Sequence, residues 1–247
     1  MREQPTQQPP PVQKLRIQYA KRGRLRFTSH RDFGRSFERA IRRANLPIAY
    51  SSGFSPHPRI SYANASPTGA SSEAEYLEIG VTTPCDPAAV QARLDEALPD
   101  GLDIVTVVVA APGALADRLE ASRWRIEMSG VEPAAAAEAA QRFLAETSVE
   151  VERMTKRGMR RFDCRAAVIS LSARSGQVTD GTCAILDLVV RHGTPAVRPD
   201  DILAGLREIG GLVAPVPPHQ IRIAQGPLEL ETGSVGDPLG PDRDASA

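Results

Sequence analysis

Apolar and polar residues alternate from Leu15 to Tyr19, near the beginning of the chain. A period of two is typical of a β-strand that buries one face. Residues 21–23 indicate a bend, after which the alternation resumes. We therefore expect Arg24 and Arg26 to lie on a continuation of this strand.

A helix is predicted from His30 to Asn45. Ser29 is a typical N-cap residue, and Asp32 follows three residues later, where a carboxylate suits the positive end of the helix dipole. The helix pattern has an apolar face and an arginine face, which is typical of a helix packed on a core. The apolar face consists of Phe33, Phe37, Ala40, Ile41 and Ala44, and the opposite face of Arg31, Arg35, Arg39 and Arg42.

Strand patterns recur after this helix, and Asp86-Pro87 provides an N-cap and a first-turn proline for a second helix. The segment 51–58 (SSGFSPHP) is predicted to be a loop, because Pro56 and Pro58 lack the N–H that a sheet interior requires. The first half therefore has the order β-α-β-β-α-β. Its later strands are predicted at 48–50, 59–63, 73–81 and 102–109.

The second half indicates the same order, with helices that begin at Pro133 and Pro199. This order is the split-βαβ signature of a ferredoxin-like unit, so we predict the α+β fold class with two tandem units of this kind. A single mixed α/β domain with one continuous sheet is the competing architecture. The predicted strands are 123–129, 149–154, 162–172, 182–191 and 219–224. The predicted segments are a disordered lead-in (1–13), a first unit (14–110), a connector (111–122), a second unit (123–226) and a disordered tail (227–247).

Composition excludes several classes of protein. No apolar run approaches the roughly 20 residues of a membrane helix, and the Gln/Pro-rich beginning does not resemble a secretory signal, so we expect a cytoplasmic protein without a membrane partner. The three cysteines, Cys85, Cys164 and Cys183, are too sparse for a disulfide framework and lack the spacing of a zinc or iron–sulfur site. The sequence contains no phosphate-cradling glycine loop, dinucleotide fingerprint or nucleophile elbow. We predict no metal and no cofactor.

Charge is segregated within a balanced chain. The whole chain has 30 Lys and Arg against 30 Asp and Glu, yet the stretch from Lys14 to Tyr62 has twelve basic residues and only two acids. Guanidinium groups bind phosphates through paired hydrogen bonds, so a positive surface here favours RNA. The alternative is that the arginines only solvate an outward helix face.

Two histidines belong to this basic stretch. His30 begins the predicted helix, and His57 lies between two prolines of the loop. They are candidates for phosphate contact or for proton transfer, although no catalytic residue is assigned; the alternative is a capping or hydrogen-bonding role for each. The predicted nucleic-acid-binding residues of the stretch are Arg24, Arg26, His30, Arg31, Arg35, Arg42, His57 and Arg59.

Two further groups of charged residues have alternative interpretations. Glu73, Glu75 and Glu78 are either metal ligands or a general base, or else solvent-facing partners of the arginines. The basic loop 155–161 either presents Lys156, Arg157 and Arg160 to a phosphate backbone or protects an exposed sheet edge with charge.

The segment RFTSHRDFGRSFERAIRRANLPIAYSSGFSPHPRISYANASPTG, followed by SEAEYLEI, resembles the radical SAM-associated protein family of bacteria. The similarity is strongest from Arg26 to Ile79 and includes the RRFDCRAAVISL stretch of the second half. Members of the family are fused to a B12-binding-type radical SAM protein or encoded next to one. Ser55 replaces a histidine of the family's turn, which argues against a multi-histidine metal site.

The resemblance implies a partner more than a reaction. This chain lacks the close cysteine triplet of a radical SAM enzyme, so the resemblance implies a noncatalytic RNA-binding or substrate-presenting partner of such an enzyme, linked to RNA modification or translation and acting on tRNA or rRNA. One alternative is an RNA-cleaving or RNA-modifying enzyme that uses His30 and His57. The other is an adaptor that docks an acidic protein surface on its basic face.

Overall fold

The computed structural model describes residues 7–155, 158–177 and 181–245. It confirms a mixed α+β protein. The chain divides into two compact units: residues 1–118 together with 238–247, and residues 119–237. Within the described residues, no helix has the length and apolar character needed to cross a membrane.

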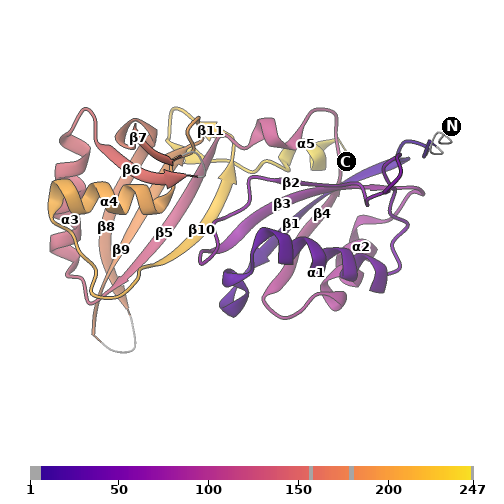
Figure 1. Cartoon of the computed structure of the whole chain (residues 1–247), viewed down its shortest axis with the longest axis horizontal. Helices are drawn as coiled ribbons and strands as arrows, with labels where there is room; N and C mark the ends of the chain where they lie inside the picture. The colour runs from indigo at the N-terminus through magenta and orange to yellow at the C-terminus, as the bar shows by residue number, and fades with distance from the viewer. Residues whose placement is uncertain (1–6, 156–157, 178–180, 246–247) are drawn as a thin grey trace. The chain divides into compact units, whose positions relative to one another are not determined.

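Unit 1 has an antiparallel sheet in the order β4-β1-β3-β2. The central strand β1 pairs Ile17 with Leu77 of β3 and with Val107 of β4. Helices α1 and α2 lie side by side on this sheet (Figure 1). The elements are β1 (Gln13–Lys21), η1 (Gly23–Phe27), α1 (His30–Arg43), β2 (Ile60–Ala63), β3 (Ser71–Val81), α2 (Pro87–Ala97), β4 (Leu102–Val109), η2 (Leu115–Arg118) and α5 (Gly240–Asp244).

The core of unit 1 lies between the sheet and the two helices. Leu15 and Ile17 are fully buried, as the alternation predicts, and the ring of Tyr19 stacks on Phe33 with 4.4 Å between centroids. Phe37 and Ile41 of α1 join the same cluster. Burial of each such side chain stabilises the fold by roughly 1.5–3 kcal/mol, so α1 is fixed through its apolar face.

Arg24 and Arg26 do not continue the first strand, contrary to the prediction. They lie in the short 3₁₀-helix η1, which begins at Gly23 with a positive φ of 53°. That backbone conformation ends the strand and favours glycine. Phe27 is 59% exposed, so the apparent alternation there does not reflect burial.

The C-terminal segment differs from the expected disordered tail. Residues 238–245 belong to unit 1, where Leu239 and the carboxylate residue Asp242 are fully buried. Asp242 pairs with Arg16 at 2.5 Å and with Arg118 at 2.8 Å. The Gly, Pro and Asp content of the tail indicated disorder. Composition could not show that Asp242 pairs with a buried arginine far away in the sequence. At the other end of the chain, Val12 donates its N–H to the carbonyl of Val81, so the end of the expected lead-in is tied to β3.

Unit 2 has an antiparallel sheet in the order β10-β5-β9-β8, with α3 packed against β8 and β9 and also against α4. Two predicted segments differ. Thr155 ends β6 and residues 158–161 lie in β7, which pairs with β6, so these residues of the predicted basic loop are in strands. The predicted strand 162–172 is interrupted by η3. The elements are β5 (Ala121–Ser129), α3 (Pro133–Ala145), β6 (Glu150–Thr155), β7 (Gly158–Asp163), η3 (Arg165–Ala167), β8 (Val168–Gln177), β9 (Thr182–Arg191), α4 (Pro199–Gly210), β10 (His219–Gly226), β11 (Leu228–Glu229) and β12 (Ser234–Val235).

Candidate nucleic-acid interface

Helix α1 is the centre of the candidate interface. Ser29 caps it by accepting a hydrogen bond from the N–H of Asp32 at 3.2 Å, as the sequence pattern predicts. Because Phe33 and Phe37 are buried, the arginines on the opposite face point away from the core. The exposed arginines of this face are Arg31, Arg35, Arg39 and Arg42.

The acids of α1 compensate this charge only weakly. Arg35 lies 3.9 Å from Asp32, and Arg42 lies 3.7 Å from Glu38, and all four side chains are substantially exposed. Exposed pairs at such separations contribute about 0–1 kcal/mol and are screened by salt. The face therefore keeps a positive potential that an anionic chain can use.

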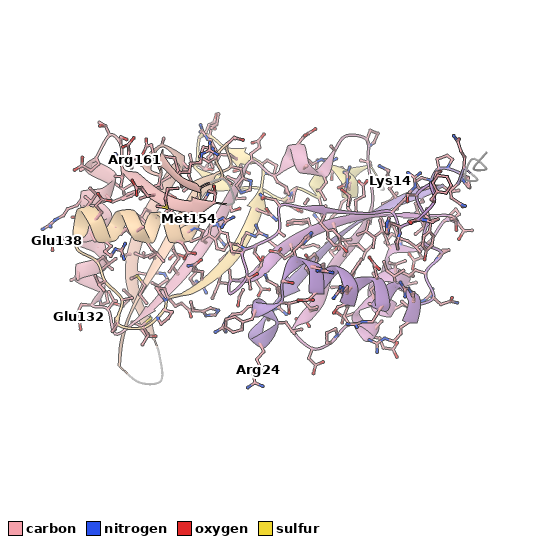
Figure 2. All side chains as sticks on the ribbon, in the orientation of Figure 1. Lys14, Arg24, Glu132, Glu138, Met154 and Arg161 are labelled. Atoms are coloured by element: carbon pink, nitrogen blue, oxygen red, sulfur yellow. The ribbon has the colours of Figure 1, made fainter. Side chains whose placement is uncertain are left out.

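Helix η1 adds two more guanidinium groups just before α1. Arg26 stacks over the ring of Phe27, with 4.5 Å from Cζ to the centroid, and is half-buried. Arg24 is exposed, and Figure 2 shows it pointing away from the ribbon. Both side chains are accessible to a ligand, although η1 rather than a strand holds them.

His30 contacts the aromatic ring of Tyr62 on β2. The ring centroids are 4.9 Å apart, and the rings are nearly perpendicular at 85°. The Tyr62 hydroxyl is buried and has no hydrogen-bond partner among the described residues. Burial, and to a lesser extent the charge of Glu38, raises the pKa of Tyr62 to about 12. Tyr62 therefore stays protonated at neutral pH.

His57 lies elsewhere, in the loop before β2. This loop is closed by Ser51, which donates its N–H to the His57 carbonyl at 2.8 Å and accepts the His57 N–H on its hydroxyl at 3.0 Å. The His57 side chain is exposed. Among the described residues, no hydrogen bond or ring contact joins it to His30, so the structure does not bring the two imidazoles together.

The same loop carries exposed aromatic side chains that the sequence reasoning missed. Phe54 is 75% exposed, and Tyr50 is 37% exposed. Arg59 donates from Nε to the backbone carbonyl of Tyr50 at 3.2 Å, so a cationic side chain is held next to the Tyr50 backbone. Exposed aromatic rings beside cations are the chemistry of base stacking on single-stranded nucleic acid. The signal was present in the sequence, because Phe54 stands in a proline-bounded loop that cannot bury it.

Glu73 and Glu78 of β3 pair with basic residues, and the buried Glu75 accepts the N–H of Ser66 at 3.0 Å. Glu73 binds Arg22, with hydrogen bonds of 2.8 and 3.1 Å, and raises the pKa of that guanidinium. Glu78 binds Lys14 at 2.8 Å and the buried Arg16 at 3.1 Å. In the described part of the chain, no group of three or more His, Cys, Asp or Glu side chains is arranged to hold a metal ion.

The β6–β7 hairpin is the second basic candidate. Arg160 is exposed, and Arg161 pairs with Glu150 at 2.6 Å. The exposed side chains of Met154 and Met159 face each other across the two strands. Lys156 and Arg157 lie outside the described residues, so Arg160 is the one of these three predicted residues that the structure describes.

The sequence model of one bacterial protein family, "Uncharacterized protein conserved in bacteria (DUF2344)", matches residues 14–199. The chain belongs to this family. The matched range begins in β1 and ends at the first residue of α4. It therefore includes α1, the β6–β7 hairpin and the loop before β2 that carries Phe54, called the aromatic loop below. No curated protein matches the chain.

One solved structure similar to this chain is an unknown protein from Galdieria sulphuraria. Its identity to this chain is 14%, over 85% of this chain and 98% of that protein, with a TM-score of 0.24. At that TM-score the similarity supports no conclusion about this DUF2344 protein.

Proposed function

We propose that this DUF2344 protein is a noncatalytic RNA-binding partner of a radical SAM enzyme, and that it binds RNA through α1 and the adjoining loops of unit 1. The observation that carries the proposal is the exposed arginine face of α1, where the described residues form two ion pairs and both exceed 3.5 Å. Phosphate contacts are assigned to the exposed or half-buried arginines Arg24, Arg26, Arg31, Arg35, Arg42 and Arg59.

The fold proposal that accompanies this function is a ferredoxin-like framework in each unit. Support comes from the sheet orders β4-β1-β3-β2 and β10-β5-β9-β8, in which each unit's first strand lies at the centre and all pairs are antiparallel. The β6–β7 hairpin is then an insertion in unit 2. Such a framework leaves loops and one helix face free to carry a binding surface.

The partner is inferred from the resemblance of residues 26–79 to radical SAM-associated proteins. The test is affinity purification of the tagged protein from its native host with nuclease treatment, followed by identification of the bound proteins. Recovery of a radical SAM protein after nuclease treatment supports the partnership, and its absence under crosslinking conditions contradicts it.

RNA binding is tested by filter binding of tRNA and rRNA fragments across a salt series. The double variant R31Q/R35Q should weaken binding and lower the slope of log K against log salt by roughly 1.4, since each lost contact to a single strand contributes about 0.7. The matched control is R142Q/R174Q, which removes two charges from unit 2, where Arg142 pairs with Glu138 and Arg174 with Asp187. Equal effects of the two double variants, or negligible binding at low salt, would contradict the proposal.

A further inference from the structure

A cavity of about 490 Å³ lies at the C-terminal end of α1. Its lining consists of Ser36, Arg39, Arg42 and Arg43 from α1 together with Pro99, which follows α2. Three of the five lining residues are therefore arginines, and a hydroxyl is the other polar group. The volume falls within the about 300–1,000 Å³ of small-ligand pockets.

Two of the three guanidinium groups have only neutral hydrogen-bond partners among the described residues. Arg39 donates to the Ser36 hydroxyl at 3.1 Å, and Arg43 donates to the carbonyl of Ala97 at the end of α2. Arg42 alone lies within ion-pair distance of a carboxylate, at 3.7 Å from the exposed Glu38. The cavity thus combines three cations with one weak anionic partner.

The position of Arg43 is fixed by the packing of the two helices. Its bond to Ala97 joins the ends of α1 and α2, and Arg93 makes the reciprocal connection by donating to the carbonyls of Ala44 and Asn45. Arg43 and Arg93 also line a second cavity of about 390 Å³. Glu96 is the one acidic residue among the described residues that line it. Arg43 is therefore held in place before any ligand binds, which lowers the entropic cost of binding.

We propose that the 490 Å³ cavity binds a phosphate monoester, the chemical group found at a phosphorylated RNA end and in a free mononucleotide. A monoester carries about −1.5 to −2 charges at pH 7, whereas an internal phosphodiester carries one. The three arginines that line the cavity match the higher charge, and guanidinium groups offer paired N–H donors to phosphate oxygens. The RNA-end form of this inference rests on the proposed function, because Arg42 belongs to both surfaces.

The experiment measures binding of the full chain to one fluorescent oligonucleotide with three kinds of end: 5′-monophosphate, 3′-monophosphate, or hydroxyl groups only. We expect a monophosphate end to bind on the order of tenfold more tightly, because hydrogen bonds between charged groups are roughly twice as strong as those between neutral groups. R39Q should remove this preference. The matched control R31Q lies on the same helix face outside the cavity, and it should weaken all three RNAs equally and keep the preference.

A parallel titration with adenosine monophosphate and inorganic phosphate, against adenosine, distinguishes the source of the phosphate. Binding of the two phosphates that R39Q abolishes, without any binding of RNA, would support the cavity and contradict the RNA function. Tight RNA binding with no preference for any phosphorylated end, and no binding of the two small phosphates, would overturn the cavity proposal and leave the RNA function standing. Absence of all binding would overturn both.

Discussion

The first helices of the two units, α1 and α3, occupy equivalent places in the element order but differ in the charge of their exposed faces. Helix α1 carries five arginines against the two acids Asp32 and Glu38. Helix α3 is rich in alanine, and its Arg142 is matched by Glu138 at 2.5 Å, so that its exposed face is electrically balanced. The buried faces are alike in kind, with Phe37 and Phe143 fully buried. The two units thus share a similar framework but differ in surface charge, and this difference is why the RNA-binding proposal is made for unit 1.

The units also differ in how they use buried charge. In unit 1, Asp242 accepts hydrogen bonds from Arg16, Arg118 and the N–H of Ala111. In unit 2, the buried Asp201 pairs with Arg153 at 2.6 Å and accepts the N–H of Arg198 at the beginning of α4. Burial raises the pKa of Asp201, and the hydrogen bond and the nearby arginines oppose that shift. The buried carboxylate of unit 1 thus comes from a segment more than 100 residues away in sequence. In unit 2, both the buried carboxylate and its partners lie within residues 119–237.

The substitution D242N should cause the largest loss of stability, because it removes the buried carboxylate that the C-terminal segment contributes to unit 1. The substitution removes the buried charge that pairs with Arg16 and Arg118, and it leaves Glu78 as the one carboxylate that still pairs with Arg16 among the described residues. Removal of one member of a buried pair costs about 3–5 kcal/mol, and the remaining Glu78 pair places the expected loss toward the lower end of that range. Urea unfolding should show this loss, and hydrogen exchange should place it in unit 1. D244N, an exposed acid of the same helix, is the control and should change the free energy of unfolding by less than about 0.5 kcal/mol. A similar small effect for both variants would show that the C-terminal segment does not support unit 1.

The order of the main helices and strands of unit 1 and the apolar face of α1 could be predicted from the sequence, because both depend on local periodicity. In unit 2 the β6–β7 hairpin and η3 depart from the expected order. The helix was expected from His30 to Asn45 and is found from His30 to Arg43, with the expected cap at Ser29. The roles of Asp242 and of Arg43 could not be predicted in this way. Each depends on a partner brought close only by folding: Arg16 for the first, and the carbonyl of Ala97 for the second.

The cationic face of α1 could be predicted from the sequence, but the residues that lie around this face could not. Gly23 ends the first strand early through its positive φ, so the pattern at residues 24–27 misled the strand prediction. The cavity requires Pro99, which periodicity does not connect with α1. Phe54 was overlooked because a single aromatic residue in a loop has no period.

Two glycines sharpen the comparison of helix packing in the two units. In α4, a Cβ on Gly205 would lie 2.8 Å from the Phe143 ring and 3.1 Å from Val149, so G205A should overpack unit 2 and cost about 1–3 kcal/mol. In α1, a Cβ on Gly34 would meet only the Tyr62 hydroxyl, at an ordinary 3.5 Å. G34A should therefore stabilise the protein by about 0.5–1 kcal/mol. Urea unfolding of both variants checks the signs, and equal signs would contradict the packing described for the two helices.

The aromatic loop provides a test of base stacking in unit 1. F54A should weaken binding of single-stranded RNA by roughly tenfold, since one stacked base contributes about 1–3 kcal/mol. Fluorescence anisotropy measures the effect. V213A, which removes an exposed apolar side chain of unit 2, is the control and should leave affinity unchanged. An F54A protein with full affinity would exclude the loop from the interface.

The smallest expected change in stability at neutral pH concerns Tyr62. Its hydroxyl is buried and has no hydrogen-bond partner among the described residues. Its folded-state pKa of about 12 exceeds the ordinary value of 10.0. The associated stability is therefore fully present below pH 10 and is lost as the pH rises toward 12. Y62F should remove this part of the alkaline decline, and at pH 7 it should leave stability unchanged or slightly raised, because no hydrogen bond is lost. Urea midpoints at pH 7 and at pH 11 measure both effects, and an equal alkaline decline in wild type and Y62F would contradict the assignment.

Photo-crosslinking of bound tRNA or rRNA fragments, with mass spectrometry of the crosslinked peptides, tests whether unit 1 binds RNA through α1 and the adjoining loops. We expect crosslinks within residues 24–59 of unit 1, concentrated on α1 and the loop that carries Phe54, and fewer after the R31Q/R35Q substitution. Crosslinks confined to unit 2, or a pattern in unit 1 that R31Q/R35Q does not change, would contradict this expectation.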